Sequence, residues 1–111
     1  MTDEVLRRLA DVIKQRQLAD PASSYVAELC ARGPDAVLKK IGEEATEVIL
    51  ASNSGDKTAI IHEIADLWFH TLVLLARSGL DPEDILEELE KRFGKSGLDE
   101  KAARKKKQAL S

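Results

Sequence analysis

The sequence predicts an all-α protein of four to five helices, arranged as a helical bundle. Apolar residues recur at helical spacing through most of the chain, which is typical of amphipathic helices. Gly and Pro residues stand between these periodic segments, where they end one helix and begin the next. The 111 residues suffice for one domain, which we expect to occupy residues 1–94.

The expected helices follow from these boundaries. They cover residues 3–18, residues 23 or 24 to 33, residues 34–52, residues 57–78 and residues 82–94. Residues 53–56 read Asn-Ser-Gly-Asp, a strong turn sequence. A turn this short makes the third and fourth helices antiparallel, so that they form a helical hairpin.

Composition and charge limit the function classes. The net charge is −3, and the basic residues gather only in residues 95–111, a tail that we expect to be partly flexible. The single Cys30 cannot form an internal disulfide, which suits a reducing compartment. No signal peptide is evident, and the apolar run 67–76 is too short to span a bilayer. We therefore expect a cytoplasmic protein that binds neither membrane nor nucleic acid.

The helix expected at residues 57–78 is apolar in almost every direction, as a central, buried helix is. Its polar residues form a narrow stripe, within about 60° of one another around the helix axis. The stripe consists of Glu63, Asp66, His70 and Arg77. Acids in a thin stripe on a buried helix are not typical of a solvated face.

The helix expected at residues 34–52 carries a second set of acids. Glu44 and Glu47 are three residues apart, so they lie on one side of the helix. Glu44 falls at the edge of the apolar face, whereas Glu43 suits an outer, solvated position. Gly42 precedes them, at a cost to the helix of about 1 kcal/mol relative to Ala.

If the two helices pack side by side, Glu44, Glu47, Glu63 and Asp66 converge. Two carboxylates ~6 Å apart repel by roughly 3 kcal/mol at an effective dielectric constant of ~20. Several such pairs would rival the ~5–15 kcal/mol that stabilises a domain, so protons or a cation must be present. A ligand set made only of oxygens favours Mg²⁺, with Mn²⁺ possible, over Zn²⁺.

These acids form a recognisable spacing: Glu-Glu-x-x-Glu at 43–47, fifteen intervening residues, then Glu-x-x-Asp at 63–66. The pattern resembles the metal-binding signature of the all-α, MazG-like nucleoside triphosphate pyrophosphatases. The flanking residues, Ser24-Tyr25, the run 38–48 and the run 65–70, resemble those of the phosphoribosyl-ATP pyrophosphohydrolase family across residues 6–92. Val26 departs from the family pattern, in which Thr is expected.

The resemblance implies a Mg²⁺-dependent enzyme of histidine biosynthesis. Its reaction would be hydrolysis of the α–β phosphoanhydride of phosphoribosyl-ATP to phosphoribosyl-AMP and pyrophosphate. The implied metal ligands are Glu44, Glu47, Glu63 and Asp66, and the implied catalytic residues are Glu43, Glu44 and Glu47. The residues expected to bind substrate phosphates are Lys39, Lys40 and His70.

Several alternatives remain open at this level. Lys39 and Lys40 also fit ordinary ion pairs with acids four residues on, and His70 fits a satisfied core histidine or a support for Asp66. Gly42 fits close helix packing as well as room for a ligand. His62 falls outside the polar stripe and is assigned no role. A pyrophosphatase for other nucleoside triphosphates and a non-catalytic oligomerisation module are the alternative functions.

The apolar surface of residues 57–78 also predicts self-association. Covering that helix on both flanks needs at least three neighbouring helices, and only residues 34–52 offer another long apolar one. A monomer would expose more contiguous apolar surface than soluble monomers tolerate. We therefore expect a homodimer or tetramer with Phe69 and Leu72 at the subunit contact.

Overall fold

The computed structural model describes residues 2–93 and 104–105. The described part is all-α and contains five helices, so the predicted fold class is confirmed. They are α1 (Thr2–Gln17), α2 (Tyr25–Ala31), α3 (Pro34–Ser54), α4 (Lys57–Arg77) and α5 (Pro82–Glu90). The predicted basic tail, residues 95–111, lies outside the described residues except for 104–105.

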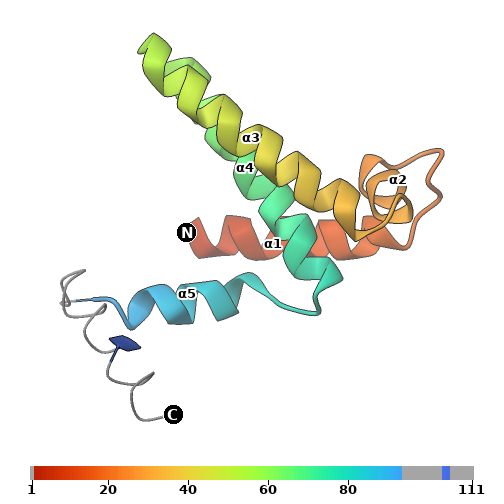
Figure 1. The fold of residues 1–111 in the computed structure, drawn as a ribbon. Coiled ribbons are helices and arrows are strands. Elements are labelled where there is room, and N and C mark those ends of the chain that lie inside the picture. Colours follow the sequence, from red (N-terminus) through yellow and green to blue (C-terminus); the bar gives the residue numbers. More distant parts are fainter. Residues whose placement is uncertain (1, 94–103, 106–111) are drawn as a thin grey trace.

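The fold is organised around the antiparallel hairpin of α3 and α4 (Figure 1). One end of this hairpin projects away from the other helices, while α1 crosses it near the opposite end and α2 packs there as well. The last helix, α5, runs beside α1. Two ion pairs join α1 to α5: Arg7 Nε lies 2.7 Å from a Glu83 carboxylate oxygen, and Lys14 pairs with Asp81.

The turn of the hairpin is tighter than predicted. Helix α3 continues through Ser54 because Gly55, at φ +75°, provides the left-handed residue that ends it. Asp56 then begins α4, and its carboxylate accepts hydrogen bonds from the backbone N–H groups of Thr58 and Ala59 at 3.0 and 3.3 Å. One glycine and one capping residue therefore reverse the chain.

The buried core lies at the base of the hairpin, where α1 and α2 pack on it. Its members come from α1, α2, the start of α3 and the end of α4. They are Ile13, Val26, Leu29, Val37, Leu72, Val73 and Leu75. The projecting end of the hairpin contributes nothing to this cluster. Val26 is 2 % exposed, so an apolar residue suits the position at which the sequence departs from the family pattern.

Within one chain, α4 is not buried on all sides, as expected from the small number of helices available to cover it. Trp68 is 57 % exposed and Ile61 is 70 % exposed. Leu72 belongs to the core and Phe69 packs against it, so these two residues are not the open ones. By length and composition, α4 is long and apolar enough to cross a membrane, although the core helices of soluble proteins pass the same test. The sequence analysis considered only the apolar run 67–76, which is shorter than the whole helix.

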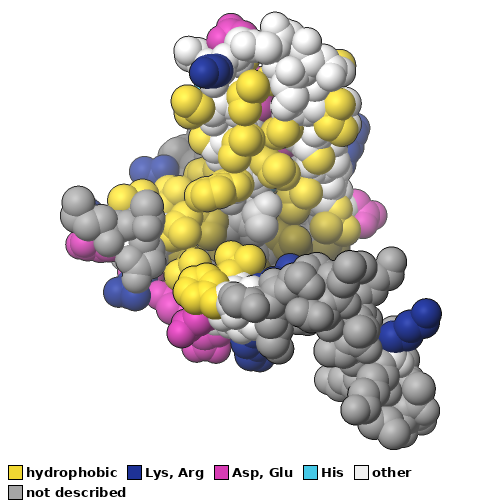
Figure 2. All heavy atoms as spheres, turned by 90° about the vertical axis from the view of Figure 1, so that its left-hand side faces the viewer, with side chains coloured by type: hydrophobic (Ala, Val, Ile, Leu, Met, Phe, Trp, Pro, Cys, Tyr) yellow, Lys and Arg dark blue, Asp and Glu magenta, His cyan; other side chains and the backbone are white. Residues whose placement is uncertain are grey.

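An apolar groove of ≈ 420 Å³ lies between α4, α5 and the start of α1. It is lined by Leu6, Leu67, Trp68, Thr71, Leu72, Leu75, Pro82, Ile85, Leu86 and Leu89. Figure 2 shows hydrophobic side chains gathered over the hairpin and the helices below it. Such a surface is typical of a contact with another molecule.

Candidate functional site

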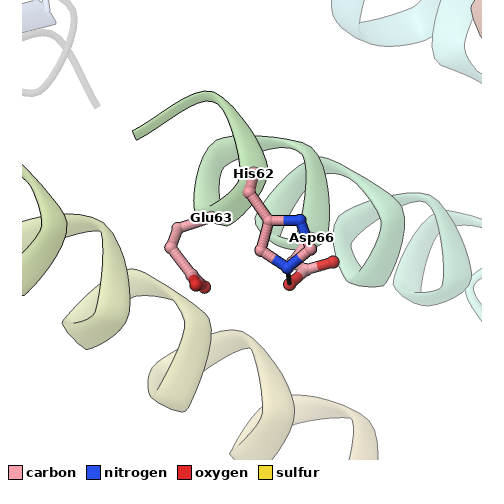
Figure 3. A group of neighbouring side chains, drawn as sticks. All are labelled: His62, Glu63 and Asp66. Atoms are coloured by element: carbon pink, nitrogen blue, oxygen red, sulfur yellow. Dashed lines mark ion pairs between the residues drawn. The ribbon is translucent and has the colours of Figure 1, made fainter. Parts of the chain in front are cut away.

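Three side chains on the projecting part of α4 form a candidate metal site. Ligand atoms of His62, Glu63 and Asp66 all lie within 4.8 Å of one another. Figure 3 shows them extending from the helix with their ends close together, and His62 Nε2 lies 3.4 Å from Asp66 Oδ2. Glu63 and Asp66 are half-buried and His62 is exposed. The predicted pairing of Glu63 with Asp66 is thus present, with an unpredicted imidazole beside it.

The acids of α3 have a different environment from those of α4. Glu44 is buried, at 8 % exposure, and Lys40 Nζ lies 3.5 Å from its carboxylate and 3.6 Å from that of Glu43. Glu43 and Glu47 are exposed. The group within 4.8 Å does not include Glu44 or Glu47, so the four predicted ligands do not form one tight cluster within a single chain. A lysine, rather than proximity to the other acids, sets the charge balance at Glu44.

The ammonium of Lys40 occupies a strongly negative environment. Burial acts to lower the pKa of Lys40, but the fields of Tyr25, Glu44 and Glu43 and the hydrogen bond to Glu44 outweigh it and raise the pKa. Lys39, by contrast, is exposed. Of the two lysines predicted to bind phosphate, Lys40 is therefore the one held among the acids of α3.

His70 is buried, and both of its ring nitrogens have partners within the chain. Nδ1 lies 2.9 Å from the carbonyl oxygen of Asp66, which can only accept, so Nδ1 carries the proton. In the neutral ring Nε2 then accepts from the hydroxyl of Tyr25 at 2.8 Å. The predicted contact of His70 with a substrate phosphate would require one of these hydrogen bonds to break.

Tyr25 joins α2 to this chain of hydrogen bonds. Ser24 caps the helix by accepting from the backbone N–H of Ala27 at 3.2 Å, which fixes Tyr25 as the first helical residue. Its ring stacks on Phe69, with centroids 6.5 Å apart. Burial raises the pKa of the Tyr25 hydroxyl, and nearby Lys40 acts in the opposite direction.

Sequence reasoning missed two members of this region. His62 stands four residues before Asp66, one turn away on the same side of the helix, and this spacing was available from the sequence. Tyr25 was noted only as part of a family pattern. Its bond to His70 spans 45 positions of the chain, and no local pattern predicts such a contact.

The donors of the α4 group suit a divalent cation. Two carboxylates are the hard oxygen ligands that Mg²⁺ and Mn²⁺ take, and an imidazole nitrogen adds affinity for Mn²⁺ and the later transition metals. The fold and the site together define an all-α protein with an acidic candidate metal centre on its central hairpin.

Comparison with known proteins narrows this class. The family model of phosphoribosyl-ATP pyrophosphohydrolase matches residues 6–93. A phosphoribosyl-ATP pyrophosphatase of Methylococcus capsulatus is 56 % identical over 102 residues, which are 92 % of this chain and 97 % of that protein. One of Chromobacterium violaceum is 55 % identical over 105 residues, 95 % of this chain and 97 % of that protein. The chain belongs to the phosphoribosyl-ATP pyrophosphohydrolase family, as the resemblance in its sequence predicted.

Proposed function

We propose that this chain hydrolyses phosphoribosyl-ATP to phosphoribosyl-AMP and pyrophosphate, as a step of histidine biosynthesis. The substrate is the one for which the family and the similar proteins are named. The structural observation that carries the proposal is the pair of half-buried carboxylates, Glu63 and Asp66, on the projecting end of α4. Membership of the family makes the protein an enzyme, against the alternative of a non-catalytic oligomerisation module.

The metal ligands that we propose are Glu63 and Asp66 of α4 with Glu44 and Glu47 of α3. Support for this set comes from its oxygen donors, which suit Mg²⁺ and also Mn²⁺. A bound divalent ion would neutralise phosphate charge and polarise a phosphoryl oxygen. Lys40 Nζ lies 3.5 Å from one carboxylate oxygen of Glu44, and the second oxygen can serve as the metal ligand.

The other side chains act on the substrate and on the water. We assign Lys40 and, from the surface, Lys39 to the phosphate oxygens, whose negative charge the two ammonium groups would balance. One of the three α3 carboxylates, Glu43, Glu44 or Glu47, would take the proton of the attacking water. Glu43 and Glu47 are exposed and thus open to that water.

His70 is better explained as a positioning residue than as a phosphate ligand. Its ring joins the hydroxyl of Tyr25 to the carbonyl oxygen of Asp66, and it is 6 % exposed. This pair of hydrogen bonds ties α2 to the turn of α4 that carries Asp66. A support of this kind fixes the direction in which a metal-binding residue projects.

The chain would act in the cytoplasm as a homodimer or tetramer. Support for self-association comes from the apolar groove and from the exposed Trp68 and Ile61 of the same helix as the acids. A second hairpin packed there would complete a four-helix arrangement and would bring the acids next to the subunit contact. Phe69 and Leu72 would support this contact from within the core.

The test is release of pyrophosphate by the purified protein with Mg²⁺, using phosphoribosyl-ATP beside ATP, dUTP and ITP. We expect turnover with phosphoribosyl-ATP and its loss in Glu63→Gln and Asp66→Asn. The matched control is Glu90→Gln, an exposed acid at the end of α5 that should leave turnover unchanged. Faster turnover of the other triphosphates would instead assign the protein to the pyrophosphatases of broad specificity.

A further inference from the structure

His62 lies beside Glu63 and Asp66, although the acidic signature does not include a histidine. We propose that His62 is a nitrogen ligand of the metal centre, so that the site binds Mn²⁺ and later transition-metal ions, which accept an imidazole more readily than Mg²⁺ does, more tightly than an all-carboxylate site would. This inference rests on the proposed metal-binding function of Glu63 and Asp66. It adds a residue and a metal preference that the signature of acids does not contain.

The geometry comes from three positions on one turn of helix. Asp66 is four residues after His62 and three after Glu63, so its side chain is the neighbour of both. Their ligand atoms lie within 4.8 Å of one another, and the imidazole nitrogen is 3.4 Å from the carboxylate oxygen of Asp66. An ion about 2.0–2.3 Å from each donor, the usual range for these metals, requires donors no more than about 4.6 Å apart, so a small rotation of these side chains would close them on the ion.

The side chains have the freedom to close on an ion. The side chain of His62 is 71 % exposed and that of Asp66 is 40 % exposed, so both can turn without disturbing the core. Figure 3 shows the two groups already directed to the same point, with Glu63 beside them. The competing interpretation is an ordinary surface ion pair one helical turn long, which contributes only a few tenths of a kcal/mol.

The chemical difference between Mg²⁺ and Mn²⁺ separates these interpretations. Mg²⁺ takes almost only oxygen ligands, and Co²⁺ and Zn²⁺ accept an imidazole readily. Mn²⁺ lies between them, because it favours oxygen but accepts an imidazole more readily than Mg²⁺ does. If His62 coordinates, its loss weakens Mn²⁺ binding and leaves Mg²⁺ binding nearly unchanged. If it is only an ion-pair partner of Asp66, its loss affects the two ions alike.

The experiment uses the full chain, free of any histidine tag, at neutral pH without substrate. Pulsed electron paramagnetic resonance of the Mn²⁺-loaded protein detects a coordinated imidazole nitrogen directly, and titration calorimetry measures the affinities for Mn²⁺ and Mg²⁺. The chain has only two histidines, and both nitrogens of His70 are hydrogen-bonded within the fold. A nitrogen coupling that disappears in His62→Gln is thereby assigned to His62.

We expect His62→Gln to lose the nitrogen coupling and to bind Mn²⁺ at least about tenfold more weakly, with Mg²⁺ affinity changed by less than about threefold. Wild-type protein without nitrogen coupling, or the same Mn²⁺ affinity in His62→Gln, would overturn the inference. Asp66→Asn separates this failure from that of the proposed function. If Asp66→Asn leaves Mn²⁺ and Mg²⁺ binding unchanged, the metal centre itself is wrong, and the role of His62 is overturned with it.

Discussion

Replacing Trp68 tests whether the apolar groove is a subunit contact. A Trp side chain buries roughly 150–250 Å² on full burial, and its 57 % exposure leaves about 110 Å² open in the single chain. At ~25 cal/mol per Å² this area is worth about 3 kcal/mol, of which we assign about 2 kcal/mol to an imperfect contact. A two-fold contact presents the residue twice, so Trp68→Ala should weaken the dimer by about 4 kcal/mol, or roughly a thousandfold.

Two measurements follow association directly. Sedimentation equilibrium gives the dissociation constant of the wild type and of Trp68→Ala. Trp68 is the only tryptophan, so the shift of its emission on dilution also reports whether association covers it. Trp68→Ala should stay folded by circular dichroism because the residue is outside the buried core. Its turnover should fall in parallel with the dimer fraction.

The control is Leu18→Ala, which removes an 89 % exposed side chain that does not line the groove. It should leave the dissociation constant unchanged. A wild-type protein that sediments as a monomer at tens of micromolar would refute the argument from the groove. An undiminished affinity in Trp68→Ala would move the contact to another surface.

Three further substitutions and a pH titration test the interior of the site. Glu44→Gln should abolish pyrophosphate release. It should lower the free energy of unfolding in urea by no more than about 1 kcal/mol, since Lys40 can turn to solvent. Retained turnover would show that Glu44 does not belong to the site. Tyr25→Phe should lower the free energy of unfolding in urea by about 1–3 kcal/mol because Nε2 of buried His70 loses its hydrogen-bond donor. An unchanged urea midpoint would contradict that hydrogen bond. Folding raises the pKa values of Tyr25 and Lys40 above their ordinary values of 10.0 and 10.5, so both groups hold their protons more tightly in the folded state. The free energy of unfolding should therefore be undiminished below about pH 10 and fall above it. In Tyr25→Phe this fall with pH should be less steep. Gly42→Ala should raise stability by about 0.5–1 kcal/mol because a Cβ there meets open space, yet lower turnover, and full activity would show that no ligand or second chain needs that space.

The helices were predictable because each one is encoded locally. Apolar spacing marked the five segments, and Gly and Pro marked their ends, so that the helix boundaries differ from expectation by only a few residues. The two largest differences are at C-terminal ends. Helix α3 runs to Ser54 because Gly55 takes the left-handed conformation, and α5 stops at Glu90 instead of Gly94.

The environment of each side of α4 was not predictable, because a helical period gives a direction but not a position along the axis. Trp68 and Leu72 are four residues apart and share a direction, yet Leu72 is 6 % exposed and Trp68 is 57 % exposed. The difference arises because the core is confined to the base of the hairpin, which only the tertiary structure shows. For this reason Leu72, one of the two residues expected at the subunit contact, is already buried within one chain.

The candidate site shows the same limit at the scale of one side chain. The sequence correctly paired Glu63 with Asp66, since three residues on a helix fix their proximity. The sequence analysis assigned His62 no role because the residue projects from the helix outside the polar stripe. Its imidazole is nevertheless long enough to reach the carboxylate of Asp66. The sequence analysis also considered Lys40 as an ion-pair partner of Glu44, and the two side chains are in contact at 3.5 Å.

The residues that stabilise the fold and the candidate metal ligands therefore occupy different parts of the hairpin. The end of α4 supplies three core residues, Leu72, Val73 and Leu75, while the candidate ligands lie six residues or more before them, beyond the buried cluster. Substitutions of Glu63 or Asp66 should consequently leave the core intact, and their effects should concern ligand binding alone. The same separation leaves the ligand-bearing end packed against α3 and away from the other helices of its chain. We expect a second subunit that covers Trp68 and Ile61 to stabilise the segment that carries the acids, so that the order of the site would depend on association.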